Sequence, residues 1–127
     1  MTTRTKNVSI MLFHGSKLES TKAEAERFVR SMAEKSGQPV KLAFLQFAEP
    51  CIDDVLREVA ENGATGIRIF PLFTLTGRHM EEDLPSAVES FRNRFPQIAV
   101  VVEPHLVSDP SFADWLGERL LKSVAHL

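Results

Sequence analysis

The sequence is poor in several features that mark common protein classes. A single cysteine, Cys51, excludes an internal disulfide and offers no paired-thiol metal site. The six glycines form neither a G-x-G-x-x-G fingerprint nor a phosphate-binding P-loop, which argues against a dinucleotide or nucleoside triphosphate site. The apolar run behind the polar residues 1–6 is much too short for a signal-peptide core or a membrane span. We therefore expect a protein of the reducing cytoplasm, without an organic cofactor.

The chain also lacks the basic excess that binding to nucleic acids or acidic membranes normally requires, because its formal net charge is −2 at pH 7. No G-x-S-x-G nucleophile elbow surrounds Ser16. What is present is an ordinary globular composition, 43% hydrophobic and 25% charged, in 127 residues. We expect residues 1–127 to form one domain. Any anionic ligand must then meet a local cationic patch.

An apolar run followed by an amphipathic segment occurs four times along the chain. The four runs, at residues 8–13, 40–47, 67–73 and 98–103, are almost continuously apolar. This pattern is typical of strands that are covered on both faces of a parallel sheet. Strands that alternate with helices indicate an α/β fold with right-handed crossovers and helices on both faces.

Each amphipathic segment carries the end signals of a helix. Thr21 and Glu24 form a capping-box pattern for the first helix, and Pro50 suits the first position of the second. The third helix is predicted to start near Asp83, and Asp109 is predicted to cap the fourth. The apolar positions predicted to face the core are Ala25, Phe28, Val29 and Met32, then Ile52, Val55, Leu56 and Val59, then Leu84, Ala87, Val88 and Phe91, and finally Ala113, Leu116, Leu120 and Val124.

A histidine or a glutamate follows each predicted strand. These residues are His14, Glu49, His79 and His105. Open α/β proteins place their chemistry at the carboxyl ends of their parallel strands, so the four side chains are expected to gather at one edge of the sheet. Imidazole binds metal ions and exchanges protons near neutral pH. The pattern therefore points to a metal or proton-handling site.

The strand-end residues do not carry equal weight. Helix capping does not explain His79. Together with His14, His79 could complete an open metal site with positions left for water or substrate. Taken alone, His14 suits a structural turn equally well. Glu49 is not a preferred N-cap, which favours a functional role, whereas His105 is expected at the rim. Cys51 is expected to be buried as a small apolar side chain, with a lowered thiol pKa as the alternative.

Three sequence elements together resemble a known family. The chain has an HGS turn after the first strand, an F-x-E-P element after the second and a P-L-F-x-x-x-G-x-H-x-x-x-D-x-P element after the third. With this joint spacing, from Asn7 to about the last helix, the sequence resembles the small class II chelatases, the sirohydrochlorin chelatases of cobalamin and sirohaem synthesis. It departs from the family pattern twice: Lys17 stands where arginine is expected, and Arg78 where glycine is usual.

The resemblance implies a fold and a reaction. The fold is a three-layer αβα chelatase-like domain whose four-stranded parallel sheet has the order 2-1-3-4. The reaction is the insertion of a divalent metal ion, cobalt before iron or nickel, into a tetrapyrrole. His14 and His79 would bind the metal and act as catalytic groups, with Glu49 as an accessory acid. The candidate substrate-binding residues are Lys17, Arg78, Ser16 and His105.

The resemblance also bears on assembly. A chain this short resembles one half of the longer two-lobed chelatases, which implies a homodimer whose subunits together enclose the macrocycle. Two alternatives of another class stay open. A non-catalytic carrier of metal or tetrapyrrole would keep the same histidines, and a structural or regulatory α/β domain would not need them.

Overall fold

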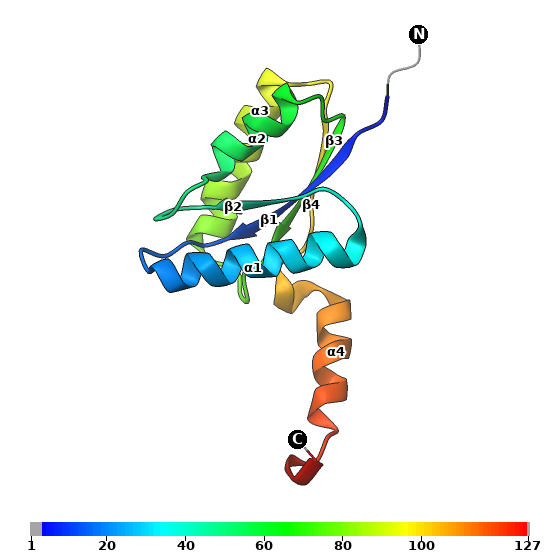
Figure 1. The fold of residues 1–127 in the computed structure, drawn as a ribbon. Helices are drawn as coiled ribbons and strands as arrows, with labels where there is room; N and C mark the ends of the chain where they lie inside the picture. Colours follow the sequence, from blue (N-terminus) through cyan, green and yellow to red (C-terminus); the bar gives the residue numbers. More distant parts are fainter. Residues whose placement is uncertain (1–3, 127) are drawn as a thin grey trace.

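The computed structural model describes residues 4–126, without the side chains of His79 and His126. Figure 1 follows the chain from the blue first strand to the red carboxyl-terminal turn. Within the described range, no helix combines the length and the apolar character that a membrane crossing needs. In chain order the elements are β1 (Asn7–Phe13), α1 (Glu19–Ser36), β2 (Val40–Phe44), α2 (Ile52–Glu61), β3 (Gly66–Pro71), the π-helical turn η1 (His79–Asp83), α3 (Leu84–Arg94), β4 (Ala99–Val102), the 3-10 turn η2 (Leu106–Ser108), α4 (Pro110–Leu120) and the 3-10 turn η3 (Val124–His126).

The four strands form one parallel sheet in the order β2-β1-β3-β4. The register places Ile10 of β1 opposite Ile69 of β3 and opposite Lys41 of β2. The predicted α/β fold, with its four-stranded parallel sheet in the order 2-1-3-4, is confirmed. Strand β2 ends at Phe44, three residues before the predicted end, because the chain turns at Phe47, whose φ is 65°.

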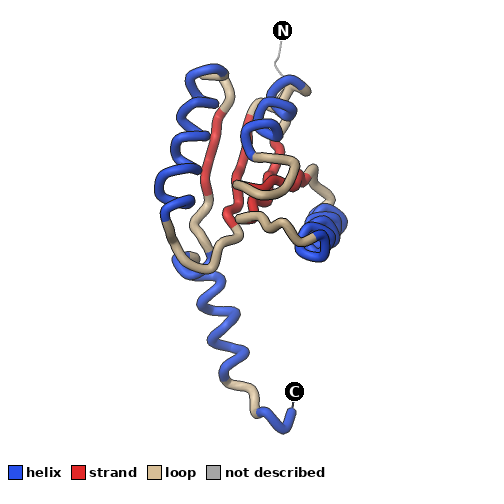
Figure 2. The backbone as a smooth tube through the Cα atoms, turned by 90° about the vertical axis from the view of Figure 1, so that its left-hand side faces the viewer, coloured by secondary structure: helices blue, strands red, loops and turns tan. Residues whose placement is uncertain are grey.

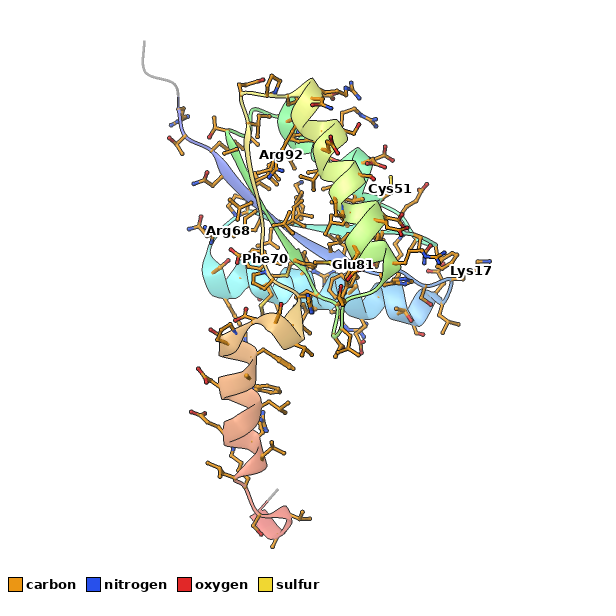
Figure 3. The ribbon with its side chains drawn as sticks, turned by 180° about the vertical axis from the view of Figure 1, so that it is seen from behind. Lys17, Cys51, Arg68, Phe70, Glu81 and Arg92 are labelled. Carbon is orange, nitrogen blue, oxygen red and sulfur yellow. The ribbon has the colours of Figure 1, made fainter. Side chains whose placement is uncertain are left out.

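The sheet lies between two helical layers. Helices α2 and α3 cover one face and α1 covers part of the other, on the side of β2 and β1 (Figures 1 and 2). Helix α4 does not join either layer but extends away from the sheet, which is also plain in the view from behind (Figure 3). The three-layer arrangement is therefore built by α1, the sheet and the α2–α3 pair.

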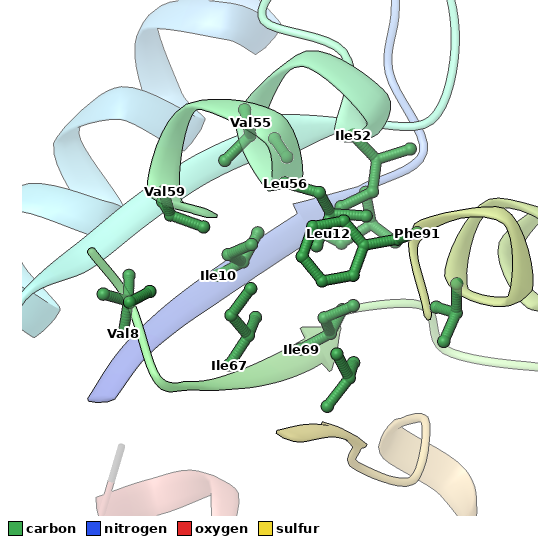
Figure 4. Packing of buried hydrophobic residues seen from close by; sticks show 14 of the residues in the cluster. Val8, Ile10, Leu12, Ile52, Val55, Leu56, Val59, Ile67, Ile69 and Phe91 are labelled. Carbon is green, nitrogen blue, oxygen red and sulfur yellow. The ribbon is translucent and has the colours of Figure 1, made fainter. Parts of the chain in front are cut away.

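The hydrophobic core lies between the sheet and the α2–α3 layer (Figure 4). Alternate residues of the central strands enter it, and Ile10, Leu12 and Ile69 are completely buried. Burial of an aliphatic side chain of this size contributes about 1.5–3 kcal/mol. The predicted inward face of α2 is confirmed, since Ile52, Val55, Leu56 and Val59 are all buried, and α3 contributes Leu84, Val88 and Phe91.

The predicted start of α1 is wrong. The helix begins at Glu19, two residues before Thr21, and its N-cap residue Leu18 makes no side-chain capping bond. Instead, the backbone N–H of Leu18 donates to Ser16 Oγ at 3.1 Å, which holds the turn that enters the helix. The helix ends at Ser36, and Gly37 follows as its C-cap residue with φ of 66°.

The predicted start of α2 is also wrong. Pro50 does not occupy the first helical position; it follows a cis peptide bond after Glu49, and the helix begins at Ile52. The Pro50 carbonyl accepts a hydrogen bond of 2.8 Å from the backbone N–H of Phe44. The loop after β2 therefore folds back beside the end of its own strand before the helix starts.

Helix α4 shows one correct and one wrong prediction. Asp109 caps it as predicted, by accepting a hydrogen bond of 2.8 Å from the backbone N–H of Ser111. The predicted buried face is wrong, because no residue of α4 is buried. Leu116 is 43% exposed and Leu120 is 78% exposed. The helix has an apolar stripe, but its own sheet does not cover it.

Candidate active site at the carboxyl edge of the sheet

The loops after β1, β2 and β3 meet at the carboxyl edge of the sheet. The backbone N–H of Leu45 donates to Phe13 O at 2.9 Å, and that of Gln46 donates to His14 O at 3.0 Å. On the other side of β1, the N–H of Leu72 donates to Leu12 O at 2.9 Å. Backbone hydrogen bonds like those of the sheet therefore continue beyond the ends of the strands. They place the loop after β1 between the loops after β2 and β3.

A glycine allows the first two loops to approach each other. Gly15 has φ of 108°, and a Cβ at this position would lie closer than 3.0 Å to the carbonyl oxygen of Gln46. Only glycine combines this backbone angle with so close a contact. The predicted turn at Gly15 is thus a structural requirement, and it sets the direction in which His14 leaves the sheet.

His14 is an exposed imidazole framed by an amide and two aromatic rings. Its Nε2 lies 3.0 Å from Gln46 Nε2, and its ring centroid lies 6.4 Å from that of Phe47 and 6.2 Å from that of Phe73. The Gln46 amide and the His14 imidazole are thus hydrogen-bonded through Nε2 of the ring, and the tautomer of the imidazole sets which of the two donates. Gln46 therefore contacts the imidazole of His14 directly, from the loop after β2.

A cavity of about 350 Å³ opens beside His14, and we call it the His14 cavity. The loop after β3 forms most of its wall, so the first and third loops do face each other. The predicted substrate residue Arg78 is exposed and belongs to this wall. The lining residues are His14, Leu72, Phe73, Thr74, Leu75, Gly77, Arg78 and Met80.

The side chain of His79, the second predicted metal ligand, lies outside the described part of the structure. Its backbone begins the turn η1, and its chain neighbours Arg78 and Met80 both line the His14 cavity. The turn is held by the backbone N–H of Glu81, which donates to Gly77 O at 2.8 Å. The backbone position of His79 is therefore at the wall of the His14 cavity.

A second cavity, of about 430 Å³, lies between the loops after β1 and β2, and we call it the Lys17 cavity. It brings together three predicted site residues, Ser16, Lys17 and Glu49. Lys17 Nζ lies 5.6 Å above the centroid of the Phe47 ring, which also contacts His14. Phe47 therefore lines the Lys17 cavity and also lies beside His14, which lines the His14 cavity. The lining residues are Ser16, Lys17, Leu18, Glu19, Lys22, Phe47, Ala48 and Glu49.

His105 lies apart from both cavities. It is half-buried at the start of η2, where Ser108 Oγ lies 3.3 Å from its Nδ1 and donates to its carbonyl oxygen at 2.9 Å. The neighbouring Leu106 N–H donates to Phe73 O at 2.9 Å, so η2 supports the wall of the His14 cavity from behind.

Cys51 is the N-cap residue of α2 and is half-buried. Burial raises the pKa of its thiol, and the coulombic effect of Asp54 and Asp53 acts in the same direction. The alternative of a lowered thiol pKa is therefore wrong. A protonated thiol is a poor nucleophile and a poor metal ligand.

Sequence reasoning missed Gln46, Phe47, Phe73 and Lys22. Amide and phenylalanine side chains belong to no recognised sequence motif. The one available signal was that Gln46, Phe47 and Phe73 lie next to predicted strand ends. Among the side chains that the structure describes, no three or more of His, Cys, Asp and Glu cluster as a metal site.

The sequence was compared with known protein families and solved structures. The CbiX family model matches residues 9–123, which is most of the chain. The chain belongs to the CbiX family. Among curated relatives of this CbiX-family chain, a sirohydrochlorin ferrochelatase of Priestia megaterium is 31% identical over 84% of the chain, and a sirohydrochlorin cobaltochelatase of Sulfolobus acidocaldarius is 27% identical over 91%.

Solved structures show the same fold. The sirohydrochlorin chelatase SirB of Bacillus subtilis subspecies spizizenii, in complex with cobalt, aligns with a TM-score of 0.77 at 26% identity over 91% of the CbiX-family chain. A CbiX protein from Marinobacter aquaeolei VT8 aligns with a TM-score of 0.71 at 23% identity over 92% of the chain and 99% of its own length.

The CbiX-family chain is shorter than several of its relatives. It spans 53%, 41% and 44% of the ferrochelatases of Arabidopsis thaliana, Priestia megaterium and Bacillus subtilis, which is about half their length. It covers 50% of the SirB chain. In contrast, it covers 91% of the cobaltochelatase of Sulfolobus acidocaldarius.

Proposed function

We propose that this chain is a sirohydrochlorin chelatase that inserts a divalent metal ion into the tetrapyrrole at the His14 cavity. The observation that carries the proposal is an exposed imidazole, His14, in an open cavity whose opposite wall includes the residues on either side of His79. The names of the relatives support the reaction class, since they are ferrochelatases and cobaltochelatases of sirohydrochlorin. The metal ion is a substrate of this reaction.

The reaction exchanges two protons for one metal ion. Each of two pyrrole N–H groups loses a proton, and the metal ion leaves its first ligands for the macrocycle nitrogens. In the proposal, His14 and His79 hold the incoming ion and accept the released protons. Gln46, 3.0 Å from His14 Nε2, orients the imidazole and must release it when the ion arrives.

The anionic edge of the substrate requires cations. Sirohydrochlorin carries many carboxylates, whereas the chain has a net charge of −2, so local positive charges must bind them. Lys17 and Lys22 line the Lys17 cavity, and Arg78 lines the His14 cavity. Phe47, which lines the Lys17 cavity beside His14, offers an exposed ring against which the macrocycle can lie.

Glu49 is proposed as an accessory acid. It lines the Lys17 cavity together with Ser16 and Lys17. A carboxylate there offsets the charge of the incoming cation and limits how tightly carboxylates of the substrate are held. We assign His105 to the rim, without contact to the metal.

Cobalt is the proposed metal, with iron and nickel as further candidates. Imidazole ligands accept several divalent ions in an order set by the ion more than by the site. The names of the relatives of similar length favour cobalt, because curated relatives that the chain covers over 91% of their own length, such as that of Sulfolobus acidocaldarius, are cobaltochelatases. The proposed setting is the cytoplasm, where a reducing environment suits the single Cys51.

Two copies of the chain are proposed to form the working enzyme. The chain spans about half of the longer ferrochelatases, so a second copy would supply the missing half. Each copy would then present one carboxyl edge to the macrocycle.

The test is the absorbance change that follows metal insertion, with sirohydrochlorin and cobalt in excess. The wild-type rate should exceed the rate without protein. His14→Ala and His79→Ala should each lose activity by about 100-fold, which is the effect of removing a group that transfers protons. His105→Ala is the matched control, because it removes a strand-end histidine outside both cavities, and its loss should be much smaller. A wild-type rate equal to the background would refute the proposal, and equal losses in all three variants would remove His14 and His79 from the mechanism.

A further inference from the structure

The base of the loop after β3 is held by the segment after β4. The carbonyl oxygen of Phe73 accepts a hydrogen bond of 2.9 Å from the backbone N–H of Leu106, and that of Thr74 accepts one of 3.2 Å from Val107. In the described part of the chain, these bonds to η2 end at Thr74. The loop tip, which we define as residues 75–78, therefore needs other contacts to keep one position.

Glu81 contacts the loop tip through both its main chain and its side chain. Its backbone N–H donates to Gly77 O at 2.8 Å, and its Oε1 accepts a hydrogen bond of 3.2 Å from Thr76 Oγ1. Figure 3 labels Glu81 near the start of α3. The two bonds tie the ends of a short segment together, and this segment contains Arg78 and the backbone of His79.

The surroundings of Glu81 indicate a residue that acts through its neighbours. Gly77, Arg78 and Met80 line the His14 cavity, but Glu81 does not. Its Oε1 accepts from a hydroxyl group, which only serine or threonine can supply from an aliphatic side chain of this size. The carboxylate is therefore engaged with the loop tip and not with the cavity.

We propose that the Thr76–Glu81 hydrogen bond positions Arg78 and His79. It holds the loop tip against η1, so that both residues stay at the wall of the His14 cavity before a ligand arrives. The inference rests on the proposed function, which assigns His79 to the metal ion and Arg78 to the substrate. A site that is formed only part of the time binds its ligand correspondingly more weakly. Thr76 and Glu81 are thus positioning residues.

A set of variants separates the hydrogen bond from the charge. Thr76→Val removes the donor with little change in size, and Glu81→Ala removes the acceptor. Thr76→Ser keeps a hydroxyl group, and Glu81→Gln keeps an acceptor oxygen without the negative charge. Glu82→Ala is the matched control, because it removes an exposed acid from the next position of η1 that does not line the His14 cavity.

Hydrogen exchange in the free chain tests the position of the loop tip without any reaction. Amides of residues 75–80 should exchange about two- to tenfold faster in Thr76→Val and Glu81→Ala, the range expected for loss of one hydrogen bond. Thr76→Ser, Glu81→Gln and Glu82→Ala should exchange as the wild type does. Unchanged exchange in Thr76→Val and Glu81→Ala would overturn the proposal.

The cobalt dependence of metal insertion tests the positioning role. With sirohydrochlorin in excess, the cobalt concentration that gives half the maximal rate should rise about two- to tenfold in Thr76→Val and Glu81→Ala. The maximal rate should change by less than about twofold, because saturating metal restores the occupied site. Thr76→Ser and Glu81→Gln should restore the wild-type cobalt dependence.

The two measurements distinguish the ways in which the inference can fail. A lower maximal rate in both Glu81→Ala and Glu81→Gln would indicate proton transfer by Glu81 and would contradict positioning. Faster exchange with an unchanged cobalt dependence would limit the hydrogen bond to stability and would also contradict it. A wild-type chain that inserts no metal would refute the proposed function, whereas unchanged exchange in active variants would refute only the role of Thr76 and Glu81.

Discussion

A series of three glycine substitutions tests how Gly15 positions His14. Gly15 has φ of 108°, and a Cβ there would collide with the carbonyl oxygen of Gln46. Gly37 has φ of 66° but a Cβ would meet no atom within 4 Å, and Gly77 has neither problem. Substitution of each by alanine therefore separates the cost of the backbone angle from the cost of the collision.

The expected costs differ in size. Gly77→Ala should change the free energy of unfolding by less than about 0.5 kcal/mol, as at an ordinary surface position. Gly37→Ala should cost about 1–2 kcal/mol for a left-handed backbone angle, partly offset by about 0.4–1 kcal/mol because alanine restricts the unfolded chain. Gly15→Ala combines the unfavourable backbone angle with the collision, so it should lower the free energy of unfolding by about 3 kcal/mol.

Urea unfolding followed by circular dichroism measures all three variants. The collision involves the carbonyl of Gln46, whose backbone N–H donates to His14 O at 3.0 Å, so relief of the collision must separate the first two loops. Gly15→Ala should therefore also reduce any activity that depends on His14. The reasoning fails if Gly15→Ala is no more costly than Gly37→Ala.

Three further predictions follow from local structure. Ile10→Ala removes a completely buried side chain and should lower the free energy of unfolding by about 2–5 kcal/mol, against about 0.5–1.5 kcal/mol for Ile10→Val; similar values for both would place Ile10 outside the core. Asp109→Ala deletes the 2.8 Å cap of α4, so amide exchange at Ser111 should quicken by about five- to thirtyfold. Because burial raises the pKa of Cys51, its alkylation should reach half its maximal rate at a higher pH than that of a free cysteine; an equal or lower midpoint contradicts this.

The strands of the sheet were predictable because a strand that is buried on both faces is almost continuously apolar in sequence. The apolar runs at residues 8–13 and 67–73 identified β1 and β3, and the resemblance supplied the order that places them side by side. The inward face of α2 was equally predictable, because its four apolar positions have helical spacing and all pack against the sheet.

Helix ends and the position of α4 were not predictable in the same way. Thr21 and Glu24 fit a capping box, but Ser16 Oγ binds the N–H of Leu18 and the helix starts earlier. The stripe of α4 was identified correctly as apolar. Its spacing, however, is the same whether the helix covers its own sheet or another surface.

The candidate site was predictable in part. Chemistry-bearing residues at strand ends, such as His14 and Glu49, stand out in a sequence because few structural roles explain them. Gln46 and Phe47 do not stand out, and they become neighbours of His14 only because Gly15 lets two loops touch. A backbone contact between distant segments leaves no local pattern to find.

The most direct test of the central claim is the number of metal ions inserted per chain. Sirohydrochlorin and cobalt are supplied in large excess over the protein, and the cobalt product is counted after subtraction of the uncatalysed reaction. The proposed chelatase should form many product molecules per chain, with a rate proportional to protein concentration. Formation of one product molecule per chain or fewer would contradict catalysis and would indicate a carrier.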